Sequence, residues 1–142
     1  MSLRNHATDL ETPGVLGRIK RLGWVWVLIA WTVFLWLSRL RNVLDNDELT
    51  SGGRAVRIVV VVVFVSLAAA VAASRVAPGL RQCRARMLSV FLVWTVGYWL
   101  VRGIGILIDG QYSVAFKTVH TVLMLVSLTL SALTARQMQR GR

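Results

Sequence analysis

A nine-residue motif, Trp-Thr-Val-x-x-Trp-x-x-Arg, occurs twice in this chain, at residues 31–39 and again 63 positions later at residues 94–102. The same displacement aligns the apolar stretch of residues 59–72 with that of residues 122–135. Apolar matches arise by chance in a chain rich in Val, Leu and Ala, but a block that repeats two tryptophans, a threonine and an arginine in register rarely does. The sequence therefore predicts two tandem copies of one structural unit.

Long apolar blocks identify the environment of these copies. Hydrophobic residues make up 56% of the chain, and its mean hydropathy is +0.62. The blocks lie at about residues 22–38, 58–74, 87–101 and 114–135, and the third can continue to residue 108. A membrane-spanning helix needs roughly 20 apolar residues, and in lipid only a helix satisfies the backbone of a β-branched run such as residues 59–63. We predict an all-α, polytopic membrane protein whose four transmembrane helices form two tandem helical hairpins.

Turn-forming and charged residues divide the chain into five segments. Pro78 and Gly79 separate the hairpins, and Asp109 and Gly110 form a tight turn within the second one. The expected segments are a polar tail with a basic interfacial stretch (1–21), the first hairpin (22–77), a basic loop (78–86), the second hairpin (87–135) and a basic tail (136–142).

Charge indicates the orientation. The chain has seventeen Lys and Arg, six acidic residues and a net charge of +11. The basic residues flank the apolar blocks and do not form a basic face with interleaved aromatics, so no nucleic-acid partner is predicted. Eleven lie on the side of the two tails and the central loop: Arg4, Arg18, Lys20, Arg21, Arg75, Arg81, Arg84, Arg86, Arg136, Arg140 and Arg142. Since Lys and Arg mark the cytoplasmic side, we expect both termini inside a bacterial cell and the protein in its inner membrane.

The opposite side carries a second group of cations. Arg39 and Arg102 occupy the same place in the two copies, on one helix face with a Thr and a Trp. They are either arginines that extend to the membrane interface or contacts for a lipid phosphate or a partner's carboxylate. The complete set of candidate contacts is Arg39, Arg54, Arg57, Arg102, Lys117 and His120. The acidic residues of the same loops, Asp45, Asp47, Glu48 and Asp109, favour an internal salt-bridge layer here.

Aromatic and small residues suggest two kinds of packing surface. Large aromatics dominate interface energetics, so Trp31, Trp36, Trp94 and Trp99 are candidate anchors for a partner. Small residues four apart permit close approach of helix backbones. The sequence therefore predicts a seam between the second and fourth helices, formed by Ala69 with Ala73 and Ser127 with Ser131. The seam would lie near the pseudo-twofold axis that relates the two hairpins. The alternative is that these are ordinary small residues of membrane helices.

The sequence offers little chemistry. It has no glycine-rich phosphate loop, no Ser/His/Asp set and no cluster with metal-ligand spacing. We therefore expect neither an enzyme nor a cofactor. His120 is interpreted as a hydrogen-bonded interfacial residue, with a proton relay as the alternative. Cys83, the single cysteine, is interpreted as an inert loop thiol, with acylation as the alternative.

The second hairpin carries a family resemblance. Its last helix starts with Ala115-Phe116-Lys-Thr-Val119-His120 after a Trp-rich helix and an Asp-containing turn. This resembles an uncharacterised family of small actinobacterial membrane proteins, which have an aromatic helix, an Asn-Ile-x-x-Asp-like turn and an Ala-Phe-x-x-Val-His helix start. The first copy has a similar turn at residues 42–45 but Arg57 in place of the His, whereas residues 105–109 depart from the turn. The resemblance covers each hairpin, not the tails, and implies no known activity.

Three functional hypotheses follow. The first is a non-enzymatic accessory or assembly subunit that packs against a larger inner-membrane complex, respiratory or of the cell envelope. The second is a small channel, carrier or lipid-binding module at the axis between the second and fourth helices. The third is a phage-type holin. The expected partners are membrane lipids, including anionic lipid, and a larger membrane complex or further copies of the chain.

Overall fold

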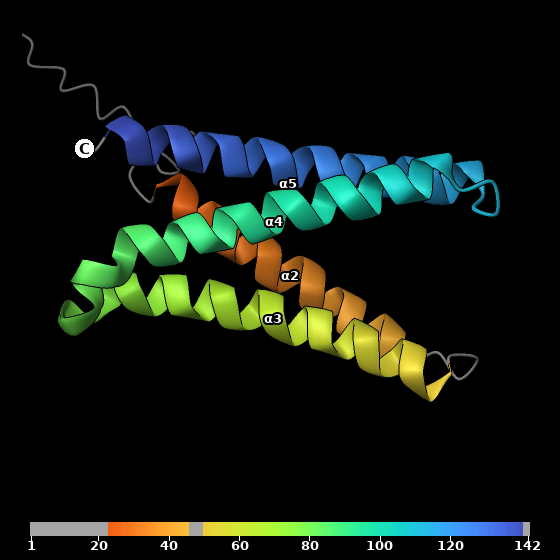
Figure 1. Cartoon of the computed structure of the whole chain (residues 1–142), viewed down its shortest axis with the longest axis horizontal. Helices are drawn as coiled ribbons and strands as arrows, with labels where there is room; N and C mark the ends of the chain where they lie inside the picture. The colour runs from red at the N-terminus through yellow and green to blue at the C-terminus, as the bar shows by residue number, and fades with distance from the viewer. Residues whose placement is uncertain (1–22, 46–49, 141–142) are drawn as a thin grey trace, which may run out of the picture.

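A computed structural model describes residues 23–45 and 50–140. Within these residues it contains four α-helices: α2 (Trp24–Leu44), α3 (Ser51–Val76), α4 (Arg84–Ile108) and α5 (Val114–Arg140). A short 3₁₀ helix, η1 (Pro78–Cys83), connects α3 with α4 (Figure 1). All four α-helices are long and apolar enough to cross a membrane. The predicted all-helical class, with four helices long and apolar enough to span a membrane, is confirmed. The predicted interfacial stretch within residues 1–21 lies outside the described residues.

The helices are longer than the apolar blocks. α2 continues to Leu44 and α5 to Arg140, because arginine is a good helix former even where hydropathy falls. α3 begins at Ser51, where the Thr50 side chain accepts a hydrogen bond of 3.2 Å from the Gly53 amide. The basic tail expected from residue 136 is thus helical as far as the structure describes it.

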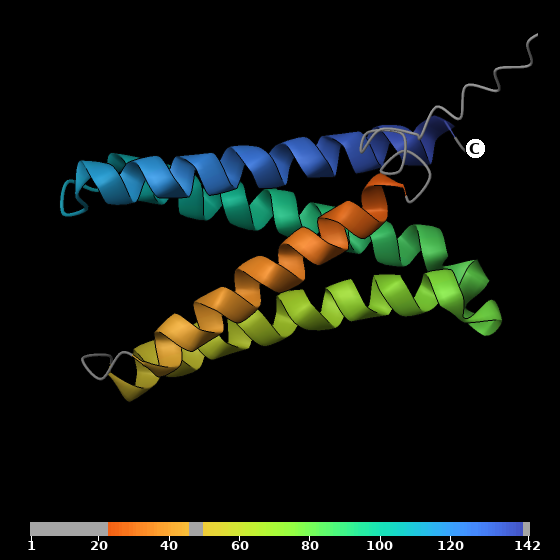
Figure 2. The same ribbon diagram turned by 180° about the vertical axis from the view of Figure 1, so that it is seen from behind.

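The helices form a four-membered ring. α2 packs against α3 and α4 against α5, and the ring closes through contacts of α3 with α4 and of α2 with α5. Both hairpin connections lie at one end of the bundle, here called the turn end, whereas α2 begins and α5 ends at the opposite, terminal end (Figures 1 and 2). The two hairpins lie close at the terminal end and diverge toward the turn end.

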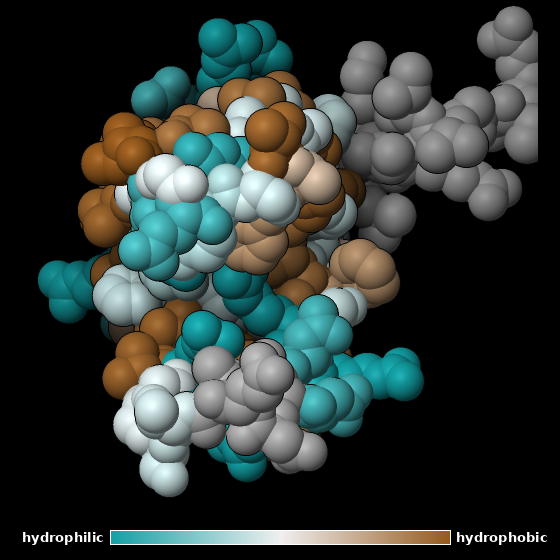
Figure 3. All heavy atoms as spheres, turned by 90° about the vertical axis from the view of Figure 1, so that its right-hand side faces the viewer, coloured by the Kyte–Doolittle hydropathy of each residue, from teal (hydrophilic) through white to brown (hydrophobic). Residues whose placement is uncertain are grey.

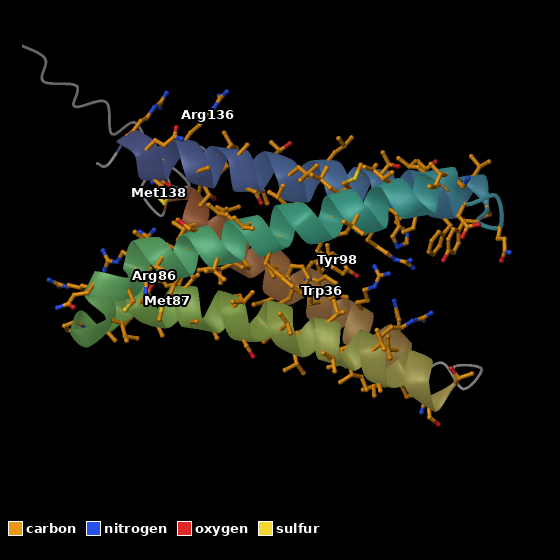
Figure 4. The ribbon with its side chains drawn as sticks, viewed as in Figure 1. Trp36, Arg86, Met87, Tyr98, Arg136 and Met138 are labelled. Atoms are coloured by element: carbon orange, nitrogen blue, oxygen red, sulfur yellow. The ribbon has the colours of Figure 1, made fainter. Side chains whose placement is uncertain are left out.

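Aromatic side chains of α2, α3 and α4 fill the centre. Trp36 stacks on Phe64 with 4.2 Å between ring centroids, and the edge of Tyr98 meets both rings at 5.3 Å and 5.1 Å. Trp36 and Tyr98 point into the space between α2 and α4 (Figure 4). The Trp-rich helices therefore supply the interior of the bundle.

The two hairpins bury corresponding positions. Several buried residues of the first hairpin recur as buried residues 63 positions later: Val25 and Leu88, Leu28 and Phe91, Ile29 and Leu92, Thr32 and Thr95, Trp36 and Trp99, Val43 and Ile106, Val61 and Met124, Phe64 and Ser127, Ala68 and Ser131, Val71 and Thr134. The inward face of each helix thus follows the register of the sequence motif.

The predicted seam between the second and fourth helices is wrong. α3 and α5 are diagonal members of the ring, and their described backbones make no close approach. Ala69 and Ala73 are exposed on the outer face of α3, and Ser127 and Ser131 are buried on α5. The sequence predicted small residues at the centre of the bundle, but aromatic side chains of α2, α3 and α4 occupy it.

Candidate functional site

The six cationic candidates all lie toward the turn end (Figure 1). Arg39 and Arg102 lie about one and a half turns before the ends of α2 and α4. The others lie in the first two turns of the following helices: Arg54 and Arg57 in α3, and Lys117 and His120 in α5. Hydrophilic side chains gather on this end of the molecule, with hydrophobic ones along its flank (Figure 3). The structure thus forms one cationic layer from all four helices.

Arg39 and His120 connect the two hairpins within this layer. Arg39 Nη1 lies 3.4 Å from His120 Nε2, and His120 Nδ1 lies 2.9 Å from the Phe116 carbonyl oxygen. Because a carbonyl oxygen only accepts, Nδ1 donates and Nε2 accepts from the guanidinium. These contacts select the neutral Nδ1–H tautomer of a buried histidine. His120 therefore acts in this structure as the acceptor that holds Arg39.

Two further hydrogen bonds join α2 to α5. Trp31 Nε1 donates to Ser127 Oγ at 3.0 Å, and the Trp24 amide donates to Gln137 Oε1 at 2.9 Å. Together with the Arg39–His120 contact, they join α2 and α5 at three points. Polar contacts therefore join α2 to α5 from the terminal end as far as Arg39, beyond which the two helices diverge (Figure 2).

The opposite side of the ring, between α3 and α4, has a different chemistry at the turn end. The residues 63 positions from Arg39 and His120 are Arg102 and Arg57, two cations that cannot repeat the donor–acceptor contact. Arg102 instead reaches Tyr112 Oη at 3.5 Å, in the turn before α5, and Arg57 is exposed. Two like charges repel each other at close range. Repulsion between Arg57 and Arg102 would therefore favour the separation of α3 from α4 at the turn end.

The acidic residues of the described turns do not neutralise this layer. Asp45 pairs with Arg41 at 3.7 Å on the surface, and Asp109 Oδ1 accepts from the Gln111 amide at 2.9 Å. The Lys117 ammonium donates to the Leu107 carbonyl at 3.0 Å. For Asp45 and Asp109 the predicted salt-bridge layer is therefore wrong, because local turn and helix contacts occupy their carboxylates. Asp47 and Glu48 lie outside the described residues.

A groove of about 790 Å³ runs along α4 and ends at the cationic layer. Its apolar lining includes Val93, Trp94, Gly97 and Val101, and Arg102 lies near its turn end. A side chain at Gly97 would meet no atom within 4 Å. The groove is therefore open where this glycine stands.

The four predicted tryptophan anchors have different environments. Trp36 and Trp99 are each only 2% exposed, so the prediction that they contact a partner is wrong. They pack inside the bundle because the ring of helices encloses the face that they share with Thr32 and Thr95. Trp31 is half-buried and bonded to Ser127. Trp94 is 40% exposed and lines the groove, so of the four it is the most accessible.

Sequence reasoning missed the groove and the contacts between α2 and α5. The sequence does not indicate the contact of Gln137, because its partner is a backbone amide distant in sequence. It does mark Gly97, because the residue 63 positions earlier is Phe34, the largest change from aromatic to small between the two motif copies. A position that loses its side chain within an otherwise repeated block can mark a binding surface.

The described part of the chain contains no group of three or more His, Cys, Asp or Glu side chains that could hold a metal ion. Cys83 is exposed at the terminal end with a free thiol. Comparisons with protein-family models, curated proteins and solved structures found no match to the chain.

Proposed function

We propose that this protein is a non-enzymatic accessory subunit that packs against a larger complex in a bacterial inner membrane, through the outer face of α3. The observation that carries the proposal is a stripe of small exposed residues on that face. Ser66, Ala69 and Ala73 are spaced by three and four positions, so they lie along one side of the helix. We call these three residues the α3 stripe.

Small residues have a specific use in a membrane. Lipid is as apolar as a leucine side chain, so helices associate there mainly by close packing of their backbones. Side chains no larger than alanine or serine permit that approach. Exposure to lipid alone would not favour them, because larger apolar residues are equally well solvated there.

The outer faces of two other helices have larger side chains over the middle of the bundle, whereas α3 has most of its large exposed residues, such as Val59 and Val62, before the α3 stripe. α2 exposes Trp26, Phe34 and Leu37, and α5 exposes Val122 and Leu125. On α3, by contrast, the three small residues of the α3 stripe follow one another along the outer face. This difference supports a helix of a partner protein as its occupant.

A channel or carrier role fits the centre of the bundle less well than the accessory role. A channel or carrier between α3 and α5 would need these helices to line a common path, but Trp36, Phe64 and Tyr98 fill the centre of the bundle. The accessory role is favoured because it uses a surface that is present and accessible.

Substitution of Ala69 tests the proposal. Ala69→Leu should reduce the partner recovered by native purification about tenfold, because overpacking of 1–3 kcal/mol falls on the shared contact. The isolated protein should keep its thermal stability, since lipid accommodates the added side chain. Ala132→Leu is the matched control, because Ala132 is also exposed and stands 63 positions later. Equal loss from both variants, or none from Ala69→Leu, would count against the α3 stripe.

We also propose that the hairpins are tandem repeats inserted from the same side, with both termini in the cytoplasm. The corresponding buried positions support the repeat. The described arginines at the terminal end, which include Arg81 in η1 and Arg86 and Arg136 (Figure 4), support the orientation.

Thiol labelling tests this orientation. Cys83 should resist a membrane-impermeant reagent in intact cells and react after lysis, because its exposed thiol would face the cytoplasm. Gly52→Cys in a Cys83→Ala background should react in intact cells, since a side chain at Gly52 meets no atom within 4 Å. The reverse pattern would place the termini outside.

A further inference from the structure

We infer that the α4 groove is a binding site for one anionic phospholipid, with the acyl chain along α4 and the phosphate at Arg102. The site lies on a different helix from the α3 stripe, so the inference does not depend on the proposed accessory role.

The first argument is the shape and lining of the groove. Its lining extends from Ser89 to Gly105 along α4, which at 1.5 Å per residue is about 24 Å. One leaflet of the hydrocarbon core is about 15 Å thick. An acyl chain that follows α4 would therefore fit within the groove.

The second argument is charge complementarity at the turn end. Arg102 lines the groove, and Arg39 lies within electrostatic range of both Arg102 and Arg57. In the described chain the hydrogen bond of Arg102 is a long contact of 3.5 Å to Tyr112. A guanidinium has five N–H donors, so most remain available for a phosphate. The charge favours an anionic ligand, and the long apolar wall favours a lipid over a free anion or an acidic peptide.

The third argument is the difference between the two copies. Gly97 leaves the groove open, whereas Phe34 occupies the corresponding position of α2. On the α2 side, Arg39 is already held by His120. The structure thus provides both an open groove and an available arginine on the α4 side.

The test uses the full chain purified in a neutral detergent. Phosphatidylglycerol with brominated acyl chains is titrated, and quenching of tryptophan fluorescence is followed, because bromine beside Trp94 would quench its emission. Trp94→Phe identifies the part of the signal that comes from the groove. Brominated phosphatidylcholine is the neutral lipid, and inorganic phosphate is the anion without a chain.

We expect saturable quenching at one phosphatidylglycerol per protein, with phosphatidylcholine about tenfold weaker, since one charge-assisted contact is lost. Arg102→Gln should weaken phosphatidylglycerol binding by a similar factor. Arg41→Gln should not, because Arg41 is a surface residue paired with Asp45. Gly97→Phe, which introduces the residue of the first copy, should abolish the Trp94 component. If Gly97→Phe does not fold, the comparison of phosphatidylglycerol binding by Arg102→Gln and Arg41→Gln still tests the inference.

Several results would overturn the inference. Equal quenching by both lipids, unchanged by Arg102→Gln, would mean only general solvation by lipid. Displacement of the brominated lipid by inorganic phosphate at equal affinity would indicate an anion site that needs no chain. If the protein is a dimer without lipid, and brominated lipid then leaves the Trp94 fluorescence unquenched, the groove would be assigned to a contact between two copies of the chain.

Discussion

Phe64→Ala is expected to lower the unfolding free energy of the isolated protein by roughly 3 kcal/mol, within the range of large-to-small core substitutions. Phe64 is 0% exposed and contacts Trp36, Tyr98 and Trp94 through its ring. Its loss would leave a cavity that three rigid aromatic rings cannot fill. Denaturation in mixed micelles, followed by circular dichroism, measures the change.

Phe34→Ala is the matched control for this prediction. Phe34 is 67% exposed, so its removal leaves no cavity within the bundle. We expect a change below about 0.5 kcal/mol, as for other substitutions away from buried features. A similar destabilisation by both variants would mean that the aromatic centre is not where the structure places it.

Gly103→Leu is expected to destabilise the second hairpin by about 1–2 kcal/mol through overpacking, because the flexible end of the Met124 side chain can shift only in part to admit the new side chain. Gly103 is buried on α4, where an added Cβ would collide with the Met124 side chain of α5. Gly105→Leu introduces the same residue two positions later, where a Cβ meets nothing within 4 Å. The same denaturation measurement should therefore show a large effect for Gly103 and a small one for Gly105.

A second substitution checks the physical cause. Met124→Ala removes the side chain that Gly103→Leu would meet. The double variant should recover much of the stability lost by Gly103→Leu, because the two sites share one packing space. Purely additive losses would indicate that Gly103 acts through its backbone and not through contact with Met124.

The number of helices could be predicted from the sequence because the requirement that lipid places on length and hydropathy is strong. Their inward faces could not. In water a polar outer face distinguishes itself from the core, but in lipid both faces are apolar. Phe34 and Trp36 are both aromatic residues of α2, yet the first is exposed and the second is buried.

The position of the cationic layer could be predicted from the sequence, but the contacts within it could not. The topology of two hairpins places Arg39, Arg102 and His120 at the same end, and the structure agrees. Which of them meet depends on how the hairpins pack together. The contact of Arg39 with His120 requires α2 to lie beside α5, and nothing local in either helix determines that arrangement.

The differences between the copies have a common physical consequence. Ser127 accepts a hydrogen bond from Trp31, whereas Phe64, at the corresponding position of α3, packs its ring against Trp94 with 6.0 Å between centroids. Substitutions of this kind turn one interface into a polar junction and the other into an aromatic one. Two hairpins of similar sequence can in this way provide two surfaces with different chemistry.

Site-specific photocrosslinking from position 69 in living cells tests the proposed role of the protein most directly. A photoreactive amino acid that replaces Ala69 should give an adduct with another, larger membrane protein, and the same replacement at Ala132 should give none. Absence of an adduct at position 69, or adducts only between copies of this chain, would contradict the proposal that the α3 stripe contacts a larger complex.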